Sequence, residues 1–266
     1  MRTVTSKDGT TIAFDQSGKG PVLILVGGAF EQRAMDSATA QLAALPLLAQ
    51  HFTVIHYDRR GRGDSTDTQP YAVEREIEDI EALINEAGGS AFVFGISSGA
   101  ALVMEAAIKL GDKMKKLAMY EAPYNSDEAA RQAWKEYRKQ LKELLAAGRR
   151  GDAVALFMTL LGMPADHLDG MRHAPVWPMF EAVAPTLAYD AAVLGEDASV
   201  PTERAASVAV PALIMDGGAT SYPFMHITAT ALANAIPNAQ HRTLEGQTHE
   251  VAAEAIAPVL VEFFKA

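Results

Sequence analysis

The sequence contains no cysteine among its 266 residues. This absence excludes disulfide bridges, thiolate metal sites and a cysteine nucleophile together. The seven histidines show no His-x-x-x-His spacing, and none falls in a run of carboxylates that resembles a closed coordination shell. We therefore expect that the protein needs no metal and no cofactor.

An excess of basic charge is also missing, because 33 acidic residues stand against 23 basic ones and the formal net charge is −10. Nonspecific nucleic-acid binding requires a concentrated basic surface, so this class of function is disfavoured. The amino-terminal segment shows no apolar h-region, and no later apolar run approaches membrane-spanning length. We expect a cytoplasmic protein whose partner is a small molecule rather than a nucleic acid or a membrane, with an oligomeric state that the sequence leaves open.

What the chain does contain is a long alternation of strand-like and helix-like segments. Strands are predicted at residues 11–17, 22–26, 52–57, 91–94, 116–120, 212–215 and 240–244, and the apolar runs among them, such as 22–26, are typical of buried strands. Between two of them, residues 73–87 repeat apolar side chains every three or four positions, as an amphipathic helix does. Strands that alternate with helices imply right-handed crossovers, so we predict an α/β fold with a mainly parallel sheet.

This alternation is interrupted between residues 124 and 206, where no convincing strand is found. Trp134, Leu141 and Leu145 suit a long amphipathic helix, and four prolines then divide the segment into short pieces. The pattern predicts a helical insertion at 124–206 within an α/β core made of residues 1–123 and 207–266.

A serine stands between two glycines in Gly95-Ile96-Ser97-Ser98-Gly99. The segment follows a strand-like run and precedes a helix-like one, so Ser97 lies at a sharp junction where glycines relieve steric strain. The first N–H groups of the new helix point toward whatever oxygen approaches that serine. The motif predicts a nucleophilic Ser97, and a glycine-rich turn without chemistry is the alternative interpretation.

A serine hydroxyl becomes a good nucleophile only when a neighbouring base takes its proton. His249 is the candidate base, because it lies in the polar segment 245–250 between the last predicted strand and the last predicted helix. In open α/β folds, the loops at the carboxyl edge of the parallel sheet carry the ligand-binding residues. An exposed polar side chain without a role is the alternative for an isolated loop histidine, and the serine motif makes it the less favoured one.

The chain resembles the α/β-hydrolase fold family over nearly its whole length. The resemblance rests on the serine turn at 95–99, Gly27-Gly28 after the third strand, the segment 58–65 (Asp-Arg-Arg-Gly-Arg-Gly-Asp-Ser) after the fourth, and His249. It implies a mainly parallel eight-stranded sheet with helices on both faces and a helical cap inserted after strand 6. For segment 58–65 we favour a structural role that braces the sheet edge.

The resemblance also implies an oxyanion hole made of backbone N–H groups. Gly28 and Ser98 are the implied donors, with Ala29 as the alternative to Gly28. Relatives often have His-Gly after the third strand, where this chain has Val26-Gly27. Hydrogen bonds made by that histidine are therefore absent, but its role is usually architectural.

Glu121 is the favoured acid to orient His249, and Asp216 is the alternative. Where relatives often carry Gly-x-x-Asp after the seventh strand, this chain has Gly217-Gly218-Ala219-Thr220. Glu121 directly follows the sixth strand, where other members of the family place their acid, and its longer side chain could reach His249. Asp216 is the competing acid, although aspartate before glycines is also a common turn residue. An ion pair with an arginine of segment 58–65 is the alternative role for Glu121.

The predicted cap carries apolar side chains, several of them flexible thioethers that adapt to irregular hydrophobic ligands. They are Phe157, Met158, Leu160, Leu161, Met163, Met171, Trp177, Met179 and Phe180. Most are expected to form the core of the cap, and several to face the pocket below it. A modest apolar acyl or ring-bearing substrate is the natural inference.

Together these features predict a serine hydrolase that cleaves a small to medium apolar carboxylic ester, lactone or related acyl compound through an acyl-enzyme. Ser97 would attack, His249 would transfer the proton, and Glu121 would orient His249. An aspartate nucleophile is disfavoured by the serine at position 97. Two other functions stay open: a cofactor-free haloperoxidase or perhydrolase activity at the same site, and a noncatalytic small-molecule binder, since fold does not determine function.

Overall fold

The computed structural model describes the backbone of residues 1–38 and 40–266, and the side chains outside residues 36–42. Its strands form one eight-stranded sheet in the order β1-β2-β4-β3-β5-β6-β7-β8. The strands are β1 (Arg2–Thr5), β2 (Thr11–Ser17), β3 (Val22–Val26), β4 (Thr53–Tyr57), β5 (Ala91–Ile96), β6 (Met114–Tyr120), β7 (Ala212–Gly217) and β8 (Ala239–Leu244).

The sheet is mainly parallel, as the alternating pattern predicts. Only the pairs β1–β2 and β2–β4 are antiparallel in the described part of the chain, and the register of the parallel strands places Ile24 opposite Ile55 and Val93. The carboxyl ends of β3, β5, β6 and β7 therefore meet at one edge. Loops that leave this edge can bring together residues far apart in sequence.

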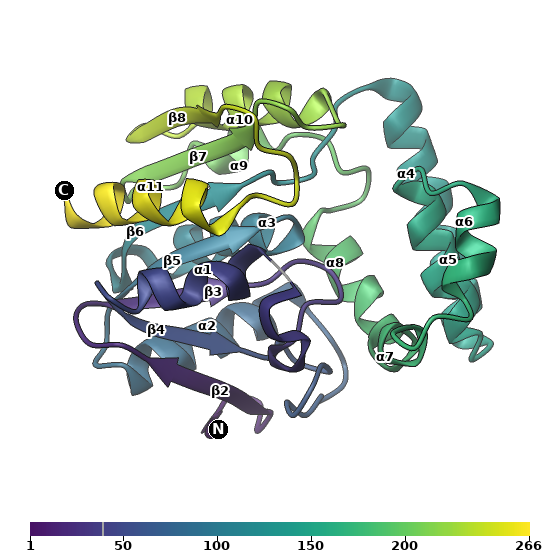
Figure 1. Cartoon of the computed structure of the whole chain (residues 1–266), viewed down its shortest axis with the longest axis horizontal. Helices are drawn as coiled ribbons and strands as arrows, with labels where there is room; N and C mark the ends of the chain where they lie inside the picture. Colours follow the sequence, from purple (N-terminus) through teal and green to yellow (C-terminus); the bar gives the residue numbers. More distant parts are fainter. Residues whose placement is uncertain (39) are drawn as a thin grey trace.

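Helices cover both faces of the sheet, as Figure 1 shows. The helices α1 (Ala40–Leu48) and α11 (Ala253–Lys265) pack on one face, and α2 (Val73–Glu86), α3 (Ser98–Leu110) and α10 (Phe224–Ala235) on the other. Successive side chains of a strand point to opposite faces. Leu23 and Leu25 accordingly join the core under α1 and α11, and Ile24 and Val26 the core under α2 and α3. Burial on both faces explains the uninterrupted apolar run of β3.

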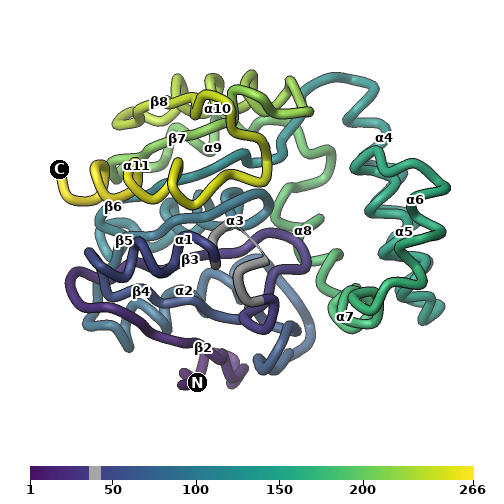
Figure 2. The backbone as a smooth tube through the Cα atoms, in the orientation of Figure 1, coloured from purple at the N-terminus to yellow at the C-terminus, as the bar shows by residue number. Residues whose placement is uncertain are grey.

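The chain between β6 and β7 is helical, and its first helices stand to one side of the sheet (Figures 1 and 2). The helices are α4 (Glu128–Ala146), α5 (Arg150–Leu160), α6 (Ala165–Met171), α7 (Trp177–Val183), α8 (Leu187–Val193) and α9 (Thr202–Ala205), with the short 3-10 turn η3 (Ala184–Thr186) before α8. The apolar faces of α4 to α8 share a core that also takes in Phe30 from the loop after β3.

The short helix α9 packs on α3 and α10, which cover the sheet, whereas α4 and α5 pack on each other. The predicted boundary of the helical insertion at residue 206 stays a prediction. The described helices include none that combines the length and the apolar composition of a membrane span.

Candidate active site

Ser97 lies at the junction of β5 and α3 with a backbone φ of 55°, a value rare for residues with a side chain. The strand ends at Ile96 and the helix begins at Ser98, so the chain turns within one residue. The N–H group of Ser97 donates a hydrogen bond to the Tyr120 carbonyl at 3.0 Å, which ties the turn to the end of β6. This strained turn directs the Ser97 side chain out of the sheet edge.

The two glycines of the motif are required by close contacts between backbone segments. A Cβ atom at Gly95 would lie 2.4 Å from the Gly99 carbonyl oxygen, and one at Gly99 would lie 2.3 Å from the Val26 carbonyl oxygen. Either contact is far below van der Waals distance, so a side chain at these positions would push α3 away from β3 and β5.

His249 lies in the loop between β8 and α11, and its Nδ1 atom is 2.7 Å from Oε2 of Glu121. The Glu121 side chain is fully buried, whereas 29% of the His249 side chain is exposed. The other carboxylate oxygen of Glu121 accepts a hydrogen bond from the Gly217 N–H at 2.9 Å. Both oxygens are thus held, and the imidazole is oriented through Nδ1.

Backbone contacts place Glu121 where it can reach His249. Its φ of 46° turns the chain sharply after β6, and its N–H group donates to the Met215 carbonyl of β7 at 3.0 Å. The neighbouring Tyr120 hydroxyl donates to the Thr248 carbonyl and so holds the loop that carries His249. Burial, followed by the nearby Glu121 and Asp216 carboxylates, raises the pKa of Tyr120, which keeps this hydroxyl protonated as a donor.

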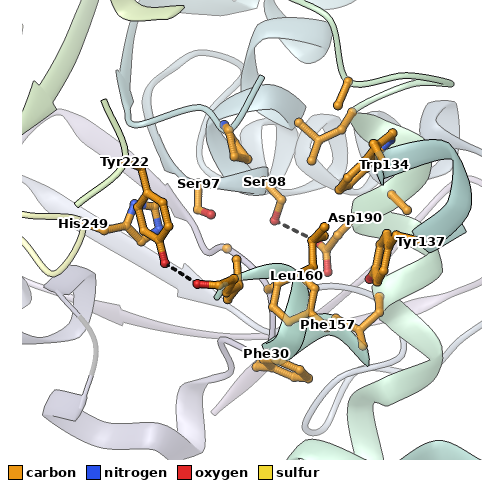
Figure 3. A pocket seen from close by; sticks show the side chains of 18 of the residues that line it. Phe30, Ser97, Ser98, Trp134, Tyr137, Phe157, Leu160, Asp190, Tyr222 and His249 are labelled. Carbon is orange, nitrogen blue, oxygen red and sulfur yellow. Dashed lines mark hydrogen bonds between the residues drawn. The ribbon is translucent and has the colours of Figure 1, made fainter. Parts of the chain in front are cut away.

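Ser97 and His249 line the same cavity, and Figure 3 shows both on the side of it away from Trp134 and Tyr137. The hydrogen bond of the His249 ring uses Nδ1, so Nε2 is the nitrogen that can take a proton from a serine. Among the described residues, Ser97 Oγ and His249 form no hydrogen bond with each other. Catalytic hydrogen bonds are often long before the substrate binds.

The two amides implied for the oxyanion hole differ in their surroundings. Gly28 lies directly beside Ser97, because a Cβ atom there would be 2.9 Å from the Ser97 Cβ. Its N–H group donates a hydrogen bond to the carboxylate of Glu31, which also lines the cavity. Ser98 begins α3 at the same edge of the cavity. The Gly28 amide therefore already holds a negatively charged oxygen.

Asp190 of α8 connects the helices between β6 and β7 to Ser98, the residue after Ser97. The Ser98 hydroxyl donates to it at 2.8 Å (Figure 3), and the buried guanidinium groups of Arg59 and Arg62 lie 2.7 and 2.8 Å from its oxygens. Burial raises the pKa of Asp190, but the charges of Arg62 and Arg59 outweigh it and lower the pKa overall. Asp190 is therefore a buried anion.

The arginines of segment 58–65 pair away from Glu121. Besides Asp190, Arg59 binds Glu76 of α2 at 2.7 Å, and Arg60 binds Asp79 of the same helix at 2.7 Å. These contacts tie the loop after β4 to α2 and α8, which fits a structural role. The ion pair considered as the alternative role for Glu121 is not formed within the described structure.

The cavity has a volume of about 600 Å³ and is lined mainly by apolar side chains. The apolar side chains contributed by the insertion include Trp134, Tyr137, Phe157, Met158, Leu160, Leu161, Phe180 and Leu187. Trp177, by contrast, is buried in the core that the helices of the insertion share. On the loop after β7, the Tyr222 hydroxyl donates to the Leu161 carbonyl at 3.0 Å and so joins the two sides of the cavity.

Asp216 is placed apart from His249. Its oxygens bind His226 Nδ1 of α10 at 2.9 Å and His241 Nε2 of β8 at 2.6 Å, and the Thr243 hydroxyl donates to it at 3.2 Å. Two histidines thus share one buried carboxylate, an arrangement that the histidine spacing in the sequence does not indicate. His226 and His241 were missed because only the pairing of β8 with β7 and the packing of α10 bring them to Asp216.

The comparison with known proteins agrees with this architecture. The chain matches the model of the alpha/beta hydrolase family over residues 22–259 and belongs to that family. An alpha/beta hydrolase from Sphaerobacter thermophilus is 55% identical in sequence, and its structure superposes with a TM-score of 0.87 over 99% of this chain and 100% of that one. The enol-lactonase from Burkholderia xenovorans shares the fold, with a TM-score of 0.70 at 21% identity over 100% of both chains.

A curated relative matches over a shorter stretch. The protein named "Probable oxidoreductase EphD" of Mycobacterium tuberculosis is 36% identical over 90 residues, which are 32% of this chain and 14% of that protein. This chain thus spans a small part of the length of the curated relatives it matches, and the likeness covers only part of either protein.

Proposed function

We propose that this member of the alpha/beta hydrolase family is a serine hydrolase that cleaves small to medium, uncharged apolar esters or lactones through an acyl-enzyme. The observation that carries the proposal is the buried Glu121 carboxylate 2.7 Å from His249, with His249 and Ser97 on one cavity. A buried acid that orients an imidazole beside a strained serine is the arrangement used for acyl transfer.

In the proposed reaction, Ser97 Oγ attacks the carbonyl carbon of the ester while His249 Nε2 takes the hydroxyl proton. Glu121 stabilises the imidazolium that forms and keeps Nε2 toward the serine. When the tetrahedral intermediate collapses, the proton passes from His249 to the leaving alkoxide and the acyl group stays on Ser97. Water then repeats the sequence with His249 as base, which releases the acid and restores the serine.

The proposed oxyanion hole consists of the Ser98 and Gly28 N–H groups. Each such donor contributes roughly 2.7 to 4 kcal/mol to transition-state stabilisation. Because Gly28 holds the carboxylate of Glu31, this side chain must turn away before the amide can bind the substrate oxygen. The Ala29 amide, on the same loop, is the alternative second donor.

The lining of the cavity supports an uncharged substrate. Glu31, Asp190, Asp197 and Glu250 contribute carboxylates, and no lysine or arginine appears among the described lining residues. An anionic substrate would meet repulsion without a compensating cation. The apolar walls favour acyl groups that bury hydrocarbon. The enol-lactonase with the same fold is one precedent for a cyclic ester.

A fluorophosphonate probe followed by an ester panel tests the proposal. The native protein should be labelled at Ser97, and Ser97→Ala should remove the label and the hydrolysis of p-nitrophenyl esters together. Equal labelling of native protein and Ser97→Ala would contradict the proposal. Failure of the native protein to be labelled, together with tight saturable binding of an ester, would favour a noncatalytic binder. Peracid formation from acetate and peroxide that exceeds ester hydrolysis would favour a perhydrolase.

A further inference from the structure

A second cluster of functional groups lies at the end of β7, formed by Asp216, His226 and His241. The three residues come from β7, α10 and β8, and one donor atom of each lies within 4.8 Å of the donor atoms of the others. The carboxylate is completely buried, whereas 57% of the His226 side chain and 26% of the His241 side chain are exposed. The cluster is thus buried on its acidic side and open to solvent on its histidine side.

We propose that Asp216, His226 and His241 form a binding site for one divalent transition-metal ion, with zinc as the best chemical match. Two imidazole nitrogens and a carboxylate oxygen form a ligand set typical of zinc, and solvent can supply the fourth position. Each neutral imidazole would carry its proton on the other ring nitrogen and present its lone pair to the metal. Tetrahedral ligand bonds of about 2.0–2.2 Å place donor atoms about 3.3–3.6 Å apart, so each histidine nitrogen must move by up to about 1 Å from its hydrogen-bonded position on the carboxylate.

The partners of Asp216 favour a metal over a purely structural carboxylate. Its described side-chain hydrogen bonds come from the two histidines and from Thr243, so no permanent cation compensates a carboxylate with no exposed surface. A buried carboxylate without such a partner is costly. A divalent ion supplies the missing charge, and the Thr243 hydroxyl supports the carboxylate from behind as partners of metal ligands do.

The position of this cluster gives a bound ion a mechanical role. It would fasten α10 to β7 and β8. The first turn of α10 contributes Phe224 and Met225 to the cavity wall, and Gly217, next to Asp216, donates to Glu121. Metal binding should therefore stabilise one wall of the cavity and the anchor of the acid. The site itself does not use Ser97 or His249, so it stands independently of the proposed hydrolysis.

Binding of zinc to chelator-treated full-length protein tests the proposal. Calorimetric titration with ZnCl₂ should show one saturable ion per chain, and ZnCl₂ should raise the thermal unfolding midpoint. His226→Ala and His241→Ala should each raise the dissociation constant for zinc by roughly 100-fold or more. Even the loss of a residue that only supports a metal ligand lowers metal affinity by about 10- to 100-fold. His226 is exposed, so its variant should fold even if Asp216→Asn does not.

Two matched variants separate this site from other histidines. His167→Ala removes an exposed histidine of the insertion and should leave zinc binding unchanged. His249→Ala should also leave it unchanged, because His249 pairs with Glu121 and not with Asp216. The proposal is overturned if zinc fails to bind, if His226→Ala and His241→Ala bind it like the native protein, or if His249→Ala is the variant that loses it.

Discussion

Two buried carboxylates lie at the ends of neighbouring strands, and each binds histidine, yet they serve different parts of the molecule. Glu121, after β6, holds His249 on the cavity, whereas Asp216, within β7, holds His226 and His241 outside it. The difference follows from side-chain direction. Ile214 and Asp216 point to the face that α10 covers, whereas His249 enters from the loop before α11, which covers the opposite face.

Whether a carboxylate lies within its strand or one residue after it determines which histidine it can reach. Asp216 still belongs to its strand, so the alternation of the strand sends it toward α10. Glu121 lies beyond its strand and adopts a positive φ, which frees it from that alternation. Proximity in the sheet is therefore insufficient to identify the acid that orients His249.

Neutralising each carboxylate without changing its shape tests which of the two orients His249. Glu121→Gln should lower kcat by about 10⁴-fold, because the equivalent amide in a serine protease favours the wrong histidine tautomer. Asp216→Asn should keep kcat within about tenfold, because it touches neither Ser97 nor His249. Steady-state hydrolysis of a p-nitrophenyl ester measures both, with circular dichroism to verify folding. The opposite ranking would assign the acid to Asp216.

Asp190 is a third buried carboxylate, and it is paired with arginines instead of histidines. Asp190→Asn leaves Arg59 and Arg62 buried with no carboxylate between them, and removal of one partner of a buried pair costs about 3–5 kcal/mol. Urea unfolding measures the loss. Asp197→Asn, which removes a more exposed pair with Arg131, is the control and should cost much less stability than Asp190→Asn.

The pH dependence of that stabilisation follows from the lowered pKa of Asp190. A carboxyl group with a lower pKa in the folded state stabilises the fold above the ordinary aspartate pKa and loses this contribution as the pH falls through its folded value. The difference in stability between native protein and Asp190→Asn should therefore be complete at pH 7 and shrink below about pH 4. A difference that grows on acidification would contradict this account.

His56 is a buried histidine in β4, and its burial should also make the stability of the protein depend on pH. Burial lowers its pKa to about 4, with Asp58 opposing the shift. In the unfolded chain this histidine binds a proton below about pH 6.5, whereas in the folded chain it binds one only near pH 4. The free energy of unfolding is therefore unaffected by His56 above pH 6.5 and falls by about 3 kcal/mol toward pH 4. His56→Gln should flatten this slope in urea unfolding at pH 7 and pH 4.5. An unchanged slope would show that other groups cause it.

Glu31 gives the smallest effect, because the substitution changes the strength of a hydrogen bond that its carboxylate accepts from the Gly28 backbone amide. Glu31→Gln should weaken the hydrogen bond to Gly28 by about 1 kcal/mol, since a charged acceptor binds more strongly than a neutral one. The substrate would then displace it more easily, and kcat/KM should rise by about fivefold. Ester kinetics measure this, and a fall in kcat/KM would instead indicate that the charge of Glu31 assists the reaction.

The parts of the site that could be predicted from the sequence have local signals. Ser97 lies in five consecutive residues whose glycines are required by the turn, and His249 follows the last strand at the sheet edge. Glu121 was favoured only narrowly over Asp216, because the sequence does not show where a side chain points once the chain leaves a strand. Strand β1 (Arg2–Thr5) is mostly polar and α1 contains Pro46, so neither has a clear hydrophobic pattern.

Contacts between distant segments could not be predicted where no motif of the family marks both partners. His241 lies 25 residues from Asp216, and Asp190 lies 131 residues from Arg59. No spacing rule connects such positions, because they meet only through strand pairing or through the packing of an insertion on the core. The hydrogen bond of Glu31 to Gly28 spans three residues, but it depends on a loop conformation that the sequence does not specify.

The bond between Ser98 and Asp190 has a consequence for how a ligand enters. Ser98, next to Ser97, is hydrogen-bonded to Asp190 of α8, and Asp190 is paired with Arg59 and Arg62, so this side of the cavity cannot move outward without separating buried charges. The opposite flank closes with the partly exposed contact of Tyr222 with Leu161. We expect α8 to stay in place when a ligand binds, and ligands to enter the cavity on the side of Tyr222.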